Sequence, residues 1–193
     1  MLKIIDFVIE ENLQVEILIN NAGFADFGDF VEADLEKNFR MIELNIATLT
    51  QLTHFFLNQM KKAGKGYIMN VASTASFMPG PGMAVYYASK AYVLSFSEAL
   101  TRELKGTGVT LTALCPGPTD TGFALAAGLK KSSFHHFLPA ATAAEVAKTG
   151  YKAMLKGKAI EIPGFMNKLS SITPRIVPRN ILRNMVHRIH KNY

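Results

Sequence analysis

The stretch YIMNVAS, Tyr67–Ser73, is a nearly continuous apolar run, typical of a strand that is buried on both faces of a sheet. Two further runs of this kind are VEILIN, Val15–Asn20, and VTLTALCPG, Val109–Gly117. Between the runs, apolar residues recur every three or four positions, which predicts helices over about Asp34–Met60 and Met83–Lys105. Strands that alternate with helices indicate an α/β fold, with a doubly wound parallel sheet covered by helices on both faces.

The C-terminal part adds one helix and one short strand to this pattern. Thr142 and Glu145 have the spacing of a capping box, which predicts a helix that runs to about Lys156. The run AIEIP, Ala159–Pro163, predicts a fourth strand. We therefore expect a folded domain over residues 1–165 and a basic tail over residues 166–193.

The tail carries most of the excess positive charge. Residues 150–193 hold nine Lys or Arg and one acidic residue, whereas residues 1–149 hold 12 basic and 14 acidic ones. After Pro178 the tail predicts an amphipathic helix with an apolar side formed by Ile181, Leu182, Met185, Val186 and Ile189. That side can lie on an anionic membrane surface, or equally pack on the domain or on a second subunit.

The overall composition excludes several classes of protein. With 49% apolar and 19% charged residues, the 193-residue chain has an ordinary globular composition rather than that of a disordered segment. Its single cysteine, Cys115, excludes a disulfide framework. The domain lacks the basic face of a nucleic-acid-binding protein. The start of the chain does not read as a signal peptide, so we expect a cytoplasmic protein.

The residues at the strand exits carry the chemistry. In a parallel sheet, ligands bind at the carboxyl ends of the strands, where Ser73 and the segment PGPTDTG, Pro116–Gly122, are expected. Tyr86 and Lys90 share one face of the helix that follows Ser73, because they are four residues apart. A nearby ammonium group is expected to lower the pKa of the phenol, so that Tyr86 can act as a general acid or base.

These motifs resemble those of the short-chain dehydrogenase/reductase family, a group of NAD(P)-dependent oxidoreductases with a Rossmann-like fold. The matching features occur in the family's order: Asn20-Asn21-Ala22-Gly23, Asn45, Ser73, the YxxxK pair Tyr86 and Lys90, and Pro116-Gly117 with Thr121. Any one of them is weak evidence, whereas the ordered set is specific.

The resemblance implies a role for each matching residue. Ser73 would bind the substrate oxygen, Lys90 would hold the nicotinamide ribose, and Asn45 would anchor a water that relays protons to Lys90. Further cofactor contacts would come from Asn21, Ala22, Gly23, Tyr86, Pro116, Gly117, Thr119 and Thr121. Position alone leaves two assignments open. Ser76 could bind the substrate oxygen in place of Ser73, and Tyr87 could be the general acid or base in place of Tyr86. No metal site is expected, and the five histidines are read as surface or loop residues.

The family's glycine-rich phosphate loop, TGxxxGxG, has no counterpart here. We therefore expect an N-terminally truncated member, in which Val15–Asn20 forms an apolar edge strand. The alternative is a non-enzymatic remnant that acts as an interaction module.

The resemblance also implies a substrate class and an assembly. The family places its substrate lid at about residues 123–139. Here this segment is apolar through Phe123, Leu125, Phe134, Phe137 and Leu138, which favours a hydrophobic carbonyl or secondary alcohol. Family members form homo-oligomers through the two long helices.

Overall fold

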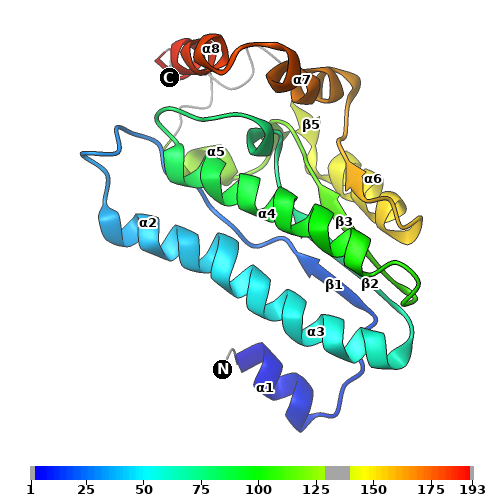
Figure 1. Ribbon diagram of the computed structural model, residues 1–193. Helices are drawn as coiled ribbons and strands as arrows, with labels where there is room; N and C mark the ends of the chain where they lie inside the picture. Colours follow the sequence, from blue (N-terminus) through cyan, green and yellow to red (C-terminus); the bar gives the residue numbers. More distant parts are fainter. Residues whose placement is uncertain (1–2, 129–139, 192–193) are drawn as a thin grey trace.

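The sheet contains four parallel strands. The computed structural model describes residues 3–128 and 140–191, and its element order is drawn in Figure 1. The main sheet has the order β1 (Ile17–Asn20), β2 (Gly66–Val71), β3 (Val109–Leu114) and β6 (Ile160–Glu161). Every neighbouring pair is parallel, and Asn20 lies opposite Asn70 in the register. The predicted parallel α/β fold is confirmed, with each strand shorter than its apolar run.

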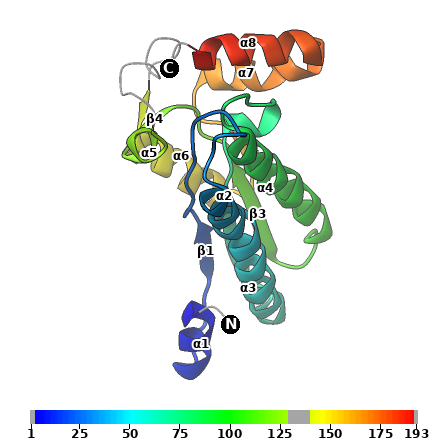
Figure 2. The same cartoon turned by 90° about the vertical axis from the view of Figure 1, so that its left-hand side faces the viewer.

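Helices cover both faces of this sheet (Figures 1 and 2). One face carries α4 (Ala84–Glu103) and a long rod built from α2 (Leu35–Ile42), η1 (Glu43–Thr48) and α3 (Leu49–Ala63). The other face carries α6 (Ala143–Leu155), whose Val146 and Met154 pack on Met69 and Leu114 of the two central strands. Sequence periodicity predicted the rod as one α-helix from Asp34, but η1 is a π-helical turn in its middle.

Local signals at the helix ends agree with the sequence. The Asp34 carboxylate accepts a hydrogen bond from the Lys37 amide and caps α2. Gly64 ends α3 in the left-handed conformation, at φ 68°, which residues other than glycine rarely adopt. Thr142 and Glu145 form both hydrogen bonds of the predicted capping box at the start of α6.

A buried polar chain fixes the edge strand against the helices. The Asn20 amide donates to Thr53 Oγ1 at 3.0 Å and to Asn70 Oδ1 at 2.8 Å, and Asn70 donates to Ser97 at 3.0 Å. These bonds join β1 and β2 to α3 and α4. Because a buried amide without partners would be costly, they specify how β1 sits on the sheet.

Among the described residues, strand β1 forms the open edge of the sheet, as expected from the lack of a glycine-rich phosphate loop. Its Leu18 packs toward the core under α3, whereas Ile17 and Ile19 on the opposite face are 37% and 45% exposed. The short helix α1 (Lys3–Glu10) precedes this strand and buries Ile5 and Val8.

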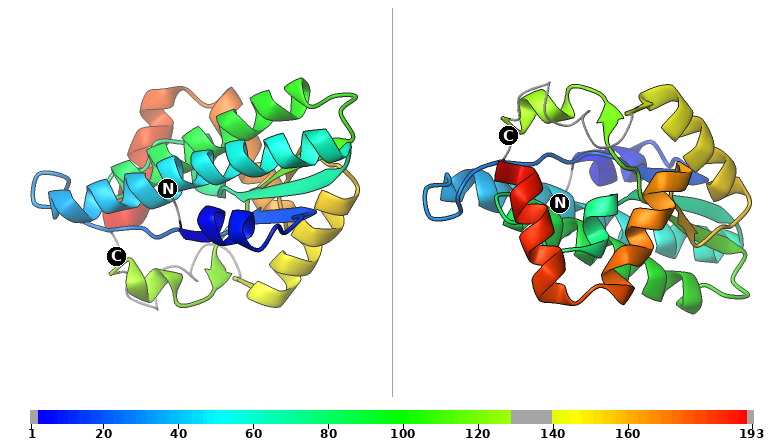
Figure 3. Two further views of the ribbon diagram at one scale, coloured as in Figure 1. Left: turned by 90° about the horizontal axis from the view of Figure 1, so that it is seen from below. Right: turned by 90° about the horizontal axis from the view of Figure 1, so that it is seen from above.

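The remaining elements surround the carboxyl ends of the strands. They are η2 (Thr74–Phe77), β4 (Thr119–Asp120), α5 (Phe123–Ala126), β5 (Ala141–Thr142), α7 (Phe165–Ile176) and α8 (Arg179–Lys191). Helices α7 and α8 lie together at the end of the molecule opposite α1 (Figure 2; Figure 3, right). The helix after Pro178 was predicted, whereas α7 was not. In the described residues, no helix combines the length and the apolarity needed to cross a bilayer.

Candidate active site

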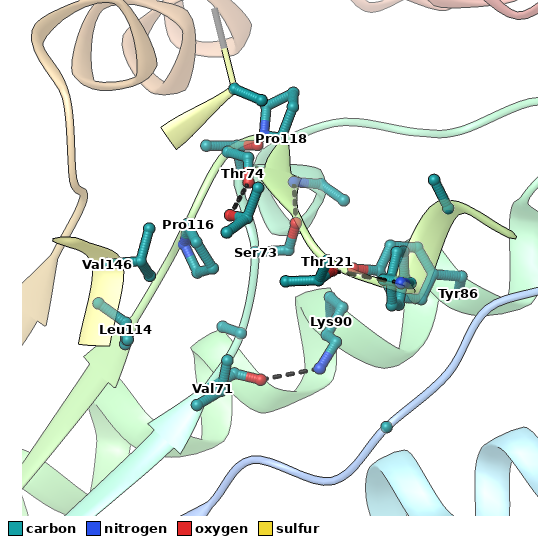
Figure 4. Close-up of a pocket in the computed structure, with 18 of the residues that line it drawn as sticks. Val71, Ser73, Thr74, Tyr86, Lys90, Leu114, Pro116, Pro118, Thr121 and Val146 are labelled. Carbon is teal, nitrogen blue, oxygen red and sulfur yellow. Dashed lines mark hydrogen bonds between the residues drawn. The ribbon is translucent and has the colours of Figure 1, made fainter. Parts of the chain in front are cut away.

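A single large cavity collects the motifs from the strand exits. It has a volume of about 1350 Å³ and lies where β2 and β3 end (Figure 4). The predicted site residues that line it are Asn21, Gly23, Ser73, Tyr86, Lys90, Pro116, Gly117, Thr119 and Thr121. Ala22 and Asn45 do not line it. Segments up to 100 residues apart in the sequence thus meet because parallel strands all end at one edge.

Ser73 and Tyr86 form the polar centre of this cavity. Ser73 directly precedes η2, and its hydroxyl accepts a hydrogen bond from the Ala75 amide at 3.1 Å. Burial raises the pKa of Tyr86 to about 12, and a side-chain hydrogen bond with Ser73 acts in the opposite direction. The expectation that Lys90 lowers this pKa is therefore wrong for this structure, because the loss of hydration outweighs other effects. At neutral pH the phenol is protonated and can donate.

Lys90 lies one helical turn beyond Tyr86 and is almost fully buried. Its Nζ donates to the Val71 carbonyl at 2.8 Å and lies 5.9 Å from the centroid of the Tyr86 ring. Within the described residues, no carboxylate lies within ion-pair distance of it. Burial therefore lowers the pKa of Lys90 to about 8, although the electrostatic influence of Cys115 opposes this change. The ammonium group is thus held at an unfavourable, desolvated position at the floor of the cavity.

Asn45 does not line the cavity, and most of its hydrogen-bonding capacity is already used within the protein. Its amide donates to the Phe24 carbonyl at 3.0 Å and to Ser89 Oγ at 3.1 Å, while its Oδ1 accepts from the Phe24 amide at 3.2 Å. Both amide hydrogens are thus used, and one lone pair of Oδ1 remains. The side chain fixes the chain after Gly23, and any relay to Lys90 would have to use that lone pair or the backbone.

Gly23 is required by close approach. A Cβ atom at this position would lie 2.9 Å from Asn45 Oδ1 and 3.5 Å from Lys90 Nζ. The Asn45 amide cannot swing away without breaking its bonds to Phe24. The motif NNAG thus ends in glycine because the chain passes directly over the Asn45 and Lys90 side chains.

We predict that Gly23→Ala lowers the free energy of unfolding by about 1–3 kcal/mol, the usual cost of overpacking a buried site. Gly122→Ala is the matched control, since a Cβ there meets nothing within 4 Å, and it should change stability by less than about 0.5 kcal/mol. Urea unfolding of the two variants measures both values. Equal stability of the two variants would show that Asn45 can give way.

The segment after β3 supplies the other wall of the cavity. Thr119 Oγ1 donates to the Gly117 carbonyl at 3.0 Å, and Thr121 Oγ1 accepts from the Phe123 amide at 3.2 Å. A Cβ atom at Gly117 would lie 2.3 Å from Asn167 Oδ1 of α7, so a side chain there would displace the Asn167 amide, which donates to the Pro163 carbonyl. The tight turn is thereby coupled to the C-terminal helices.

The two alternative assignments are separated by geometry. The Ser76 hydroxyl donates to the Lys90 carbonyl at 2.7 Å and does not line the cavity. The Tyr87 ring packs against Gly80, where a Cβ would come within 2.2 Å of it, although Tyr87 also lines the cavity. This arrangement favours Ser73 and Tyr86.

Other sequence expectations concern metals and the lid. Among the described residues, no three His, Cys, Asp or Glu side chains are placed to bind a metal ion. His54 and His187 are exposed, whereas the His135, His136 and His190 side chains lie outside the described part. Phe123 and Leu125 of the predicted lid line the cavity, and its remaining residues, 129–139, lie outside the described residues.

Sequence reasoning missed much of the cavity's apolar wall. It comes from α6 and α8, through Val146, Tyr151, Leu182, Met185, Val186 and Ile189. Of these, the α8 residues were recognised as an apolar stripe. The sequence did not say whether the stripe contacts a membrane, the domain or a second subunit. Leu182 and Val186 are buried, and both line the cavity.

Solved structures of dehydrogenases share this fold. A short-chain dehydrogenase from Sphingobium yanoikuyae in complex with NADPH has a TM-score of 0.76 at 30% identity, over 84% of this chain and 62% of that one. The bulky-bulky ketone specific alcohol dehydrogenase from Comamonas testosteroni has a TM-score of 0.69 at 25% identity, over 98% of this chain and 66% of that one. The fold is thus that of the α/β oxidoreductases.

Sequence comparison gives the family within that class. The short chain dehydrogenase family model matches residues 1–132. Sulfoacetaldehyde reductase 2 from Chromohalobacter salexigens is 40% identical over 125 residues, which is 64% of this chain and 50% of that protein. The chain belongs to the short-chain dehydrogenase family. It spans about half the length of this reductase and of an uncharacterized oxidoreductase from Bacillus subtilis, which is 34% identical over 128 residues.

Proposed function

We propose that this chain acts as an NAD(P)-dependent oxidoreductase that interconverts an apolar ketone and its secondary alcohol. The observation that carries the proposal is the cluster at the cavity floor, where Tyr86 is hydrogen-bonded to Ser73 and Lys90 follows one turn later. Similarity to an NADPH-bound dehydrogenase and to a ketone-specific alcohol dehydrogenase supports the same reaction class.

The residues present fit the nicotinamide end of a dinucleotide. Gly23 and Lys90 both line the cavity, and the glycine puts no side chain between the cavity and Lys90 Nζ, so a ribose could approach the ammonium group from the cavity. Asn21 and the pair Thr119 and Thr121 line the cavity on either side and offer hydrogen bonds to the ribose and the carboxamide. The cofactor, when bound, supplies the hydride.

The protein's own contribution is a proton and a fixed position. The Tyr86 phenol, protonated at neutral pH, would donate its proton to the carbonyl oxygen as negative charge develops on it. The Ser73 hydroxyl would hold the same oxygen by a second hydrogen bond. Lys90 would stabilise the phenolate that remains, through its positive charge.

The lining of the cavity favours an apolar substrate. Met83 and Phe123 stand near Tyr86, and α6 and α8 add the aliphatic side chains Val146, Leu182 and Val186. Phe123 packs on the Tyr86 ring with centroids 5.3 Å apart. A chain or ring system without charge would therefore gain most from this surface.

Titration with NADPH and with NADH, followed by nicotinamide fluorescence, tests the proposal on the full chain. We expect saturable binding in the micromolar range, where about −8 kcal/mol of binding free energy corresponds to 1 μM. Addition of a panel of aliphatic and cyclic ketones should then give cofactor oxidation. Absence of binding up to millimolar cofactor would overturn the proposal and favour an interaction module.

A further inference from the structure

Helix α7 has its polar side toward the protein. Asn167 Nδ2 donates to the Pro163 carbonyl at 2.7 Å, and its Oδ1 faces Gly117. Ser171 is 6% exposed, and its hydroxyl is used within the helix, donating to the Lys168 carbonyl at 2.7 Å. The side of α7 that contacts the domain is therefore built from amide and hydroxyl groups.

The opposite side of α7 is an exposed apolar stripe. Phe165, Leu169, Ile172 and Ile176 are spaced by four, three and four residues, so they lie on one face of the helix. They are exposed to 79%, 52%, 47% and 78%. On α8, Ile181 and Met185 add two half-exposed apolar side chains. This is the reverse of the usual arrangement for a surface helix, which points its apolar stripe inward.

The charge around this stripe has one sign. Residues 162–193 contain six Lys or Arg and no acidic residue. Lys168 and Arg175 of α7, and Arg179 and Arg183 of α8, are exposed, and none of the described ion pairs involves them. An exposed apolar stripe flanked by cations alone matches the two layers of an anionic bilayer surface, with acyl chains below and phosphates above.

We propose that the exposed face of α7 and α8 docks on an anionic lipid membrane. Phe165, Leu169, Ile172 and Ile176 would enter the boundary between headgroups and acyl chains, and the basic side chains would contact the phosphates. A second copy of this chain is a poorer occupant, because two such faces would oppose like charges. The same two helices line the cavity, so a membrane-dissolved substrate would meet the protein beside its site. That last step rests on the proposed function, whereas docking does not.

Co-sedimentation of the full chain with vesicles tests the docking, without any need for turnover. The probes are vesicles of phosphatidylcholine alone and vesicles that also contain phosphatidylglycerol. We expect at least tenfold stronger binding to the anionic vesicles, which two basic contacts at about 1 kcal/mol each would supply. In about 1 M NaCl, where the screening length is about 3 Å, this preference should disappear.

Two pairs of variants separate the apolar from the electrostatic part. Leu169→Glu with Ile172→Glu should abolish binding, whereas Leu35→Glu with Phe39→Glu, an equally exposed apolar pair on α2, should leave it intact. Lys168→Gln with Arg175→Gln should weaken binding by about fivefold per charge, or about 1 kcal/mol each. Lys61→Gln with Lys62→Gln on α3 is the matched control for charge.

Circular dichroism melts confirm that each variant is folded, as expected for exposed positions. Three results would overturn the proposal. The first is equal binding to neutral and anionic vesicles, and the second is binding that survives the α7 substitutions. The third is a lipid-free dimer, seen by sedimentation equilibrium, that the α7 substitutions dissociate, because a second copy would then cover this face.

Discussion

Tyr86→Phe is expected to lower the turnover of an apolar ketone by about 10²- to 10⁴-fold, the usual contribution of a positioned general acid. The variant keeps the ring that packs on Phe123 and loses only the hydroxyl that is bonded to Ser73. Affinity for NADPH should therefore change little. Steady-state kinetics, followed by nicotinamide absorbance, give the turnover, and fluorescence titration gives the affinity.

Tyr87→Phe is the matched comparison, because Tyr87 is the neighbouring tyrosine and its ring lies 6.0 Å from that of Tyr86. It should keep most of the turnover. If Tyr87→Phe removed activity and Tyr86→Phe did not, the assignment of the acid would be reversed. A similar loss in both variants would instead point to packing at this end of α4.

The positions of the site residues could be predicted because they follow from topology. Ser73 and Pro116 each follow the end of one of two adjacent parallel strands, and Tyr86 and Lys90 are one turn apart on the helix between these strands. Their meeting requires only that the strands pair in order. The direction of the Tyr86 pKa could not be predicted in this way, since it depends on how much water the fold removes around the phenol.

The π-helical turn η1 and the helix α7 show a different limit. A π turn shifts the helical register, so the apolar residues Leu35 and Phe39 before it are each 56% exposed, whereas Leu49 and Phe56 after it are buried. The sequence could therefore place Asn45 on the rod but not in its irregular turn. In α7, Pro174 argues against a helix, and the apolar stripe is on the outside. Periodicity locates an apolar face but does not say which surface it meets.

Lys90→Met is expected to stabilise the fold by about 2 kcal/mol at pH 7 while it abolishes turnover. The fold lowers the pKa of Lys90 from 10.5 to about 8, mainly through burial, so at pH 7 it holds the ammonium group at a cost. Methionine fills a similar volume without charge. The bond to the Val71 carbonyl is lost, which offsets part of the gain.

The pH dependence of the free energy of unfolding tests whether the buried charge of Lys90 causes the stability difference between the wild type and Lys90→Met. Between about pH 8 and 10.5 the unfolded chain still binds the Lys90 proton while the folded chain releases it, so the wild-type free energy of unfolding gains a contribution that rises with pH. Lys90→Met lacks that contribution. The stability gap between the two proteins should therefore narrow by about 1 kcal/mol from pH 8 to pH 9. In the wild-type protein, burial raises the pKa of Cys115 and of Tyr86 to about 12, so both groups stay protonated over this range. Lys90 lowers the pKa of Cys115, so its removal leaves the thiol protonated as well, and the two titrations largely cancel in the comparison.

Urea unfolding at pH 7, 8 and 9 measures the gap, with Lys105→Met, an exposed lysine just beyond α4, as the control that should leave stability nearly unchanged. A less stable Lys90→Met protein, or a gap that does not vary with pH, would show that the ammonium group is well solvated and is not held at a cost. A gap that narrows as expected, together with lost turnover, would mean that the fold gives up stability to keep a cation beside Tyr86. A buried ammonium group that costs stability is not needed for packing, so this result would support the proposed catalytic use of Lys90.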